Sequence, residues 1–108
     1  MITDALGALQ YILVDHTGSS QLVAAATGER VRVLGFPVVA GNSGATFRLR
    51  TNGAGGSAIT GQIILAANQP LPWPPHGLGY CEGADGANLY LEITAGSLHG
   101  TLVYQQIK

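Results

Sequence analysis

Three histidines and one cysteine are the side chains of this chain that are best suited to metal binding or nucleophilic catalysis. They are His16, His76, Cys81 and His99, and only His76 and Cys81 lie close together in the sequence. No H-x-H, C-x-x-C or H-E-x-x-H spacing occurs, and the charge nearest Cys81 is Glu82, which opposes formation of a thiolate. We therefore predict no metal, no cofactor and no small-molecule substrate, with Cys81 as a small buried apolar residue.

The acidic residues and the glycines give no catalytic pattern either. The six Asp and Glu fall almost entirely in expected turns or on outward strand positions, where solvation explains them better than paired glycosidase chemistry. The Gly53–Gly56 tract lies between two expected strands, so no helix N-terminus follows it to hold a phosphate. We predict that the protein is not an enzyme.

Four of the five positive charges form two pairs with strand spacing. Arg30 and Arg32 share one face of an expected strand, and Arg48 and Arg50 share one face of another. Like charges placed side by side cost free energy unless a partner offsets them. Two interpretations stay open. The arginines bind carboxylates on a neighbouring protein, which suits the planar guanidinium group, or they keep an outer sheet face solvated.

A proline-rich segment, residues 68–77, is the second candidate for an interface. Its prolines exclude a helix or a central strand, so we expect a stiff, extended arm. Trp73 either inserts into a pocket of another chain or forms a lid over the core of its own domain, and both interpretations stay open. If the arm contacts another chain, the contact residues are Leu71, Pro72, Trp73 and Pro74.

Length and composition place these residues in one small domain, residues 1–108, with a short N-terminal segment at residues 1–8. Only 10% of the residues are charged, against roughly 25% in ordinary soluble domains. So sparsely charged a surface favours association with other protein, and we expect a homo-oligomer. The net charge of −1 excludes the basic surface of a nucleic-acid binder, and the chain lacks the run of eighteen apolar residues that a membrane span requires.

Short alternating tracts separated by turn formers predict an all-β fold. Arg30–Leu34 alternates with a period of two, and in two further tracts Phe47 with Leu49, and Leu89 with Leu91 and Ile93, point inward. Gly35–Pro37 predicts a bulge or kink, because both residues interrupt a strand. Turn formers predict a hairpin joining residues 21–26 to 30–34, a hairpin loop at Gly41–Gly44 and a turn at Ala95–Ser97. About eight short strands result, typical of a single β-sandwich or β-barrel domain.

Three tracts in this order also resemble a known class of protein: VAAATGERVRVLGFPVVAG, GQIILAANQPLPWPPHGLGYCEGADGANLYLEI and GTLVYQQI. They are similar to small all-β structural proteins of tailed bacteriophages over most of residues 20–107. The resemblance implies a single antiparallel β-sandwich of the jelly-roll type. It further implies a head decoration (cement) protein, made in the host cytoplasm, that binds the major capsid protein as a homotrimer on the outer surface of the virion. The proline-rich arm departs from that pattern. It leaves open a tail or fibre module that binds a ligand or receptor, as lectins do.

Overall fold

The computed structural model describes residues 9–107, so the predictions for residues 1–8 lie outside the described residues. Within that range the chain forms strands, turns and loops and no helix, and the prediction of an all-β fold is confirmed. About eight short strands were expected, and eight are described, of which β4 and β8 are long: β1 (Gln10–His16), β2 (Ser20–Val23), β3 (Arg30–Gly35), β4 (Val38–Thr51), β5 (Ser57–Ala58), β6 (Ile63–Leu65), β7 (Cys81–Glu82) and β8 (Leu89–Ile107).

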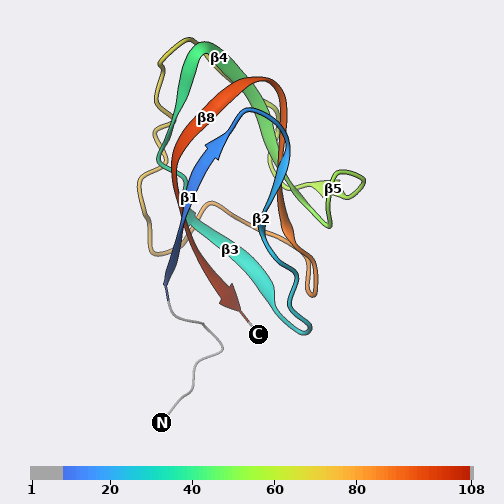
Figure 1. Cartoon of the computed structure of the whole chain (residues 1–108). Coiled ribbons are helices and arrows are strands. Elements are labelled where there is room, and N and C mark those ends of the chain that lie inside the picture. The colour runs from blue at the N-terminus through green and yellow to red at the C-terminus, as the bar shows by residue number, and fades with distance from the viewer. Residues whose placement is uncertain (1–8, 108) are drawn as a thin grey trace.

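Two long strands, β4 and β8, form the centre of the fold (Figure 1). β4 pairs with β8 from Thr51 opposite Leu89 to Val38 opposite Gly100, and β3 continues the same path to Arg30 opposite Ile107. The register shifts near Gly35, which confirms the predicted bulge. Residues 30–51 therefore run antiparallel to residues 107–89 as one long ribbon, to which the shorter strands add.

The turns predicted at Gly41–Gly44 and Ala95–Ser97 were wrong, because both segments lie inside long strands. They face each other across the ribbon, where Ala45 is the partner of Gly96 and the register shifts. Gly44 and Gly96 have φ angles of 76° and 78°, which glycine adopts without strain. A Cβ on Gly96 would lie 1.9 Å from the carbonyl oxygen of Gly44. The glycines thus let both strands bend together instead of reversing.

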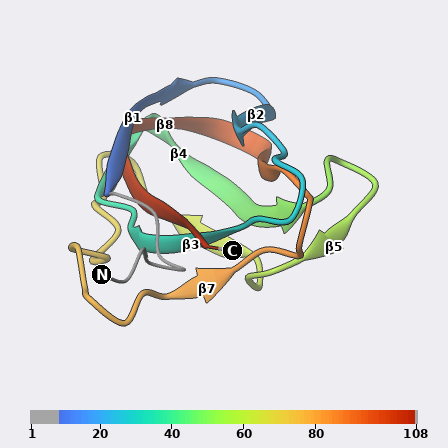
Figure 2. The same cartoon turned by 90° about the horizontal axis from the view of Figure 1, so that it is seen from below.

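All eight strands belong to one antiparallel sheet, which curls into a half-barrel (Figure 2). Its order is β5-β4-β8-β3-β7, with β6 on the free side of β4 and with β1 and β2 on the other edge of β8. The predicted hairpin between residues 21–26 and 30–34 was wrong, since β2 pairs with β8. The antiparallel arrangement is confirmed, whereas a two-layered sandwich or jelly roll is not.

The hydrophobic core fills the concave side of the curled sheet. The predicted inward residues of β4 and β8 are buried there, and Phe36 meets Phe47 edge to face with ring centroids 6.1 Å apart. Burial of each such side chain stabilises the fold by about 1.5–3 kcal/mol. The most deeply buried large side chains are Phe36, Phe47, Leu49, Leu89, Leu91, Leu98 and Leu102.

Candidate interaction surfaces

The first arginine pair, on β3, binds a carboxylate of its own chain. Arg30 Nε lies 2.7 Å from Glu82 Oε1, and Arg32 Nε lies 2.6 Å from Glu82 Oε2. Arg32 pairs with Glu82 across the sheet, so the short strand β7 positions the carboxylate between the two guanidinium groups. Hydrogen bonds from Arg30 and then Arg32 hold the pKa of Glu82 below its usual value.

The second arginine pair, on β4, also lies beside one carboxylate of its own chain, that of Glu92, but both arginines approach the same oxygen. Arg48 Nε and Arg50 Nε lie 3.3 Å and 3.2 Å from Glu92 Oε1. Arg48 also donates to Gln62 Oε1 at 3.0 Å, and Arg50 Nη1 donates to the carbonyl oxygen of Gly56 at 2.8 Å. The predicted face sharing within each pair is present, and both pairs have carboxylates from neighbouring strands. These carboxylates offset the like-charge cost without a second protein, so contact of these arginines with another chain stays a prediction.

The proline-rich segment does not project from the domain as an arm; it lies along the outer edge of β3 and β4. The N–H of Leu71 donates to the carbonyl of Val38 at 2.8 Å, and the N–H of Phe36 donates to the carbonyl of Trp73 at 2.9 Å. Farther along, the N–H of His76 donates to the carbonyl of Leu34 at 2.8 Å. The segment therefore acts as an irregular edge strand.

The four candidate residues of this segment divide by the side they face. Leu71 is buried and belongs to the core, and Trp73 is half-buried against it, whereas Pro72 and Pro74 are exposed. Trp73 stacks on Tyr80 with ring centroids 4.7 Å apart and ring planes 3° apart. This geometry is that of the lid interpretation, and contact of Trp73 with another chain stays a prediction.

The residues suited to metal or nucleophile chemistry do not gather at one place. Within residues 9–107 no group of three or more His, Cys, Asp and Glu side chains could hold a metal ion. Burial, and then the neighbouring carboxylate of Glu82, raises the pKa of Cys81 to about 11. The thiol of Cys81 is consequently protonated and unreactive near neutral pH.

Three polar residues that no sequence pattern groups together are linked by hydrogen bonds. His99 Nδ1 lies 2.7 Å from Asp15 Oδ1, and His99 Nε2 lies 3.2 Å from Ser97 Oγ. Asp15 and His99 are cross-strand partners of β1 and β8, and their side chains are 68% and 44% exposed. The order is that of a serine hydrolase triad, but so exposed a position lacks the water-shielded charge stabilisation that such catalysis requires. The hydrogen bond between Asp15 and His99 instead links the side chains of β1 and β8.

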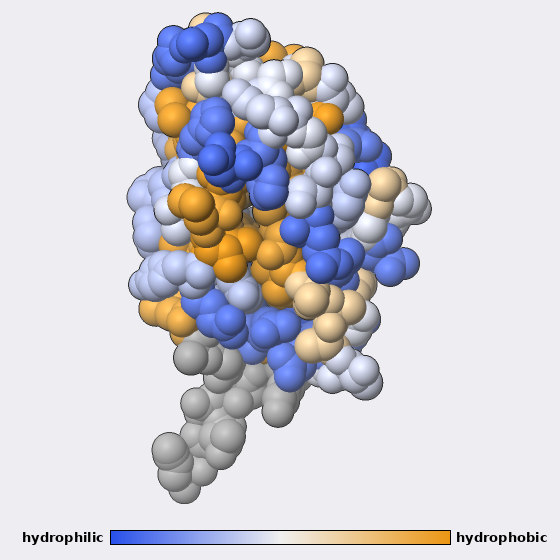
Figure 3. Space-filling model, in the orientation of Figure 1, coloured by the Kyte–Doolittle hydropathy of each residue, from blue (hydrophilic) through white to orange (hydrophobic). Residues whose placement is uncertain are grey.

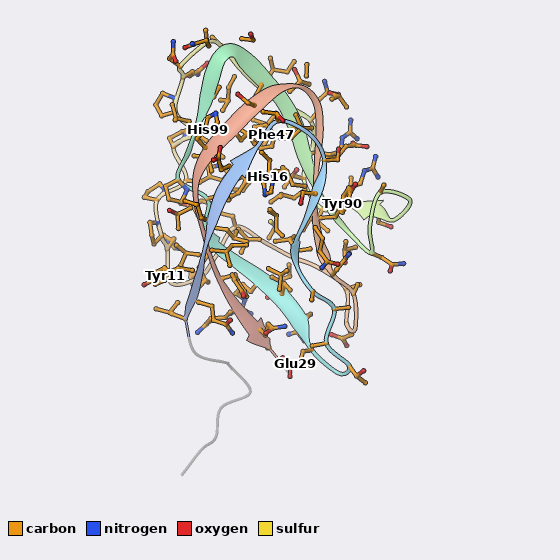
Figure 4. All side chains as sticks on the ribbon, in the orientation of Figure 1. Tyr11, His16, Glu29, Phe47, Tyr90 and His99 are labelled. Carbon is orange, nitrogen blue, oxygen red and sulfur yellow. The ribbon has the colours of Figure 1, made fainter. Side chains whose placement is uncertain are left out.

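An apolar stripe on β1 and the residue before it is the most unusual surface feature. Leu9, Tyr11 and Leu13 alternate along the chain, point away from the core and are 54%, 62% and 78% exposed. They account for three of the six large apolar residues that are exposed in the described range. Apolar side chains gather along and beside β1 in Figure 3, and Figure 4 places Tyr11 at the lower end of that strand. The alternation was present in the sequence, but the strand's partner was needed to tell its outer face from its inner one.

A shallow cavity of about 190 Å³ lies at the lower end of this stripe. Leu34 and Val103 are buried at its base, on the outer side of the sheet, outside the main core. The proline-rich segment supplies one wall and the stripe another. The lining residues are Leu9, Tyr11, Leu34, Pro75, His76, Gly77 and Val103.

Comparisons with known protein families, with curated proteins and with solved structures found no match for this chain. Within residues 9–107 there is no helix long and apolar enough to cross a membrane. The surface features described above are therefore the basis for proposing a function.

Proposed function

We propose that this chain is a non-enzymatic structural protein of a tailed bacteriophage, and that it acts as a capsid decoration protein. Made in the host cytoplasm, it binds the outer surface of the capsid as a homotrimer and bridges neighbouring subunits of the major capsid protein. In this proposal the curled sheet is a jelly-roll-like variant of the fold that the sequence resemblance implies. In this proposal the protein catalyses no reaction.

The exposed stripe of Leu9, Tyr11 and Leu13 carries the proposal. Contiguous apolar patches on soluble proteins mark surfaces that bind other molecules. The arginine clusters support the same conclusion, because Glu82 and Glu92 already offset their charge and leave little charge to keep copies apart. A domain with 10% charged residues has a surface fit to lie against other protein.

The energetics favour many repeated contacts over one strong contact. From their exposed fractions, the three stripe side chains expose roughly 400 Å² of surface. At about 25 cal/mol per Å², its burial contributes up to about 10 kcal/mol, against an association cost of similar size. A single contact is therefore weak. A shell, which repeats the contact at many symmetric sites and engages each copy more than once, makes such contacts stable together.

Reconstitution on phage heads tests the proposal. Heads of the phage that encodes the chain, assembled without it, are incubated with the purified protein and imaged by cryo-electron microscopy. We expect added density on the outer surface with three-fold symmetry and a higher temperature of genome release. Absence of the chain from purified virions, or failure of the heads to bind it, would overturn the proposal.

A second candidate, a receptor- or carbohydrate-binding module of a tail or fibre, is favoured by one observation. The stacked pair Trp73 and Tyr80 lies next to His76, whose ring centroid is 6.3 Å from that of Tyr80. Aromatic faces of this kind bind sugars and other apolar ligand surfaces. Trp73 is the only tryptophan, so its fluorescence reports directly on this cluster. Saturable quenching by host surface glycans, lost in Tyr80→Ala, would support the module, and unchanged fluorescence would exclude it.

A further inference from the structure

Strand β1 is an open edge of the sheet. It pairs with β8 from Gln10 opposite Tyr104 to His16 opposite Leu98, and β8 is its one strand partner within residues 9–107. Its other edge therefore presents backbone N–H and C=O groups that no strand of the described chain satisfies. Such an edge binds another strand readily unless charge, proline or a covering segment prevents it.

Within residues 9–107, no such protection is present on β1. Residues 9–14 contain no charged residue and no proline, and the first charge, Asp15, is already paired with His99. The outer face of the same segment holds the exposed stripe. A partner for this edge must consequently supply a neutral strand that is apolar on one face. An acidic or basic partner would place its charges beside leucine and tyrosine, where residues 9–14 offer no opposite charge to offset them.

We propose that β1 binds β1 of a second copy, antiparallel and about a two-fold axis, so that two curled sheets join into one. A two-fold contact requires a strand that is complementary to itself. With the axis at Ile12, Tyr11 lies opposite Leu13 of the second copy, and the reciprocal pair forms on the other side of the axis. Aromatic and aliphatic side chains opposite each other stabilise antiparallel pairs. A second copy is the favoured partner because residues 9–14 of its own edge are uncharged and apolar on one face, as the edge requires.

The exposed area sets the expected strength. The stripe contributes at most roughly 400 Å² per copy, because an edge-to-edge pair leaves part of the outer sheet face in solvent, and this is below the roughly 800 Å² per partner of a standard interface. The main-chain hydrogen bonds and the flanking residues add to it. We expect a dimer that forms at micromolar to tens of micromolar concentration. This inference rests on the proposed function only for the expectation that copies associate, and the two-fold contact is distinct from the trimer.

Sedimentation equilibrium from 1 to 200 µM tests the contact, with each variant's fold checked by circular dichroism. We expect the mass to rise from 11.1 kDa toward twice that value. Leu13→Lys should weaken the dimer at least tenfold, because it places a cation opposite Tyr11 of the second copy. Leu78→Lys is the matched control: Leu78 is 82% exposed, lies outside β1 and should leave the dimer unchanged.

Disulfide trapping tests the register independently. In a Cys81→Ser background, Ile12→Cys places two cysteines opposite each other at the axis, within the Cα distance that a disulfide spans. We expect rapid oxidation to a covalent dimer, whereas Leu78→Cys should oxidise slowly. A monomer at 200 µM, or a dimer that Leu13→Lys leaves intact, would overturn the two-fold contact. A trimer insensitive to Leu13→Lys would overturn it too, and would show that copies associate, as the proposed function requires, through a surface other than the stripe. Failure of phage heads to bind the wild-type protein would overturn only the proposed function.

Discussion

The two outer edges of the curled sheet differ in how they meet solvent. On one side, residues 68–83 lie along β3 and β4 and satisfy their backbone groups, from the N–H of Asn68 on the carbonyl of Gly41 to the N–H of Gly83 on the carbonyl of Val31. On the other side, β1 has no covering segment within the described residues. A leucine on each edge shows the contrast: Leu71 is 7% exposed and Leu13 is 78% exposed.

The prolines explain why the covered edge ends the sheet. Pro70, Pro72 and Pro74 alternate with Leu71 and Trp73, so the residues without an N–H are exposed while the others pack inward. A further strand would therefore meet few backbone N–H donors along this edge. β1 contains donors at every position and an apolar outer face. Within the described residues, the chain thus covers one edge of the sheet and leaves the edge at β1 uncovered.

The largest effect is expected from removing the aromatic ring of the covered edge. Trp73→Ala should lower the free energy of unfolding by about 2–3 kcal/mol, less than for a fully buried ring, because Trp73 is only partly buried. Urea unfolding followed by circular dichroism measures it, with Leu78→Ala as a control that should be neutral. If stability were unchanged while association or head binding were lost, Trp73 would be a contact residue and the covered edge would be misassigned.

Cys81 on β7 provides a chemical probe of the same edge. Because burial raises its pKa to about 11, the thiolate fraction at pH 8 is about 100-fold below that of a cysteine with a pKa near 9. Labelling by a disulfide reagent should be slower by about that factor in the folded protein than in urea. A raised pKa also means that the corresponding stability is fully present below about pH 9 and is lost as the pH rises toward 11.

Loosening the covered edge should change that rate. Trp73→Ala removes the ring that stacks on Tyr80, next to Cys81 in the chain, so local opening and labelling should both become faster. Leu13→Ala, on the bare edge, is the control and should leave the rate unchanged. Equal, fast labelling in all three proteins would show that the covered edge is not closed.

The sequence predicted the local pattern of the sheet better than its connections. The alternation around Phe47 and Leu91 identified inward faces correctly, because a half-buried strand dictates a period of two. The glycines near residues 44 and 96 were interpreted as turns, although their positive φ angles serve a shared bend of two long strands. Glycine can adopt the backbone angles of a turn and those of a bend within a strand. Only the pairing of two segments some fifty residues apart decides between them, and no local signal encodes it.

The candidate interface residues show the same limit: the sequence predicted their local geometry but not their contacts with distant segments. Spacing correctly placed Arg30 beside Arg32 on one strand face, but not the carboxylate of Glu82, which a different strand brings between them. Proline content correctly excluded a helix at Trp73, yet extended proline-rich chain serves equally well as a free arm or as a sheet edge. Hydrogen bonds between the segment and the strands β3 and β4 select the second, and those strands lie far away in the sequence.

A smaller effect is expected from the carboxylate that joins β7 to β3. Glu82→Gln should lower stability by about 1 kcal/mol, since Glu82 is partly solvated and the hydrogen bonds from Arg30 and Arg32 are weakened rather than abolished. The pKa of Glu82 is lowered, so its contribution is present above the ordinary Glu value near 4.3 and is lost as the pH falls through the lowered value. Unfolding of both proteins at pH 7 and pH 2.5 measures this. The difference in free energy of unfolding between the two proteins should disappear at pH 2.5. If it persisted there, the loss of stability would come from altered packing and not from the charge of Glu82.

The smallest effect on the folded monomer is expected at the bare edge. Leu13→Ala should change the free energy of unfolding by less than about 0.5 kcal/mol at low protein concentration, because Leu13 has little contact with its own chain to lose. Leu71→Ala is the matched variant on the covered edge, and a buried leucine there should cost about 2–3 kcal/mol. At high concentration Leu13→Ala should become destabilising as well, since a dimer that binds only the folded state stabilises it by mass action. A loss above 1 kcal/mol that does not depend on concentration would instead mean that Leu13 packs within its own domain. The stripe would then be part of the fold, and the contrast between the two edges would not hold.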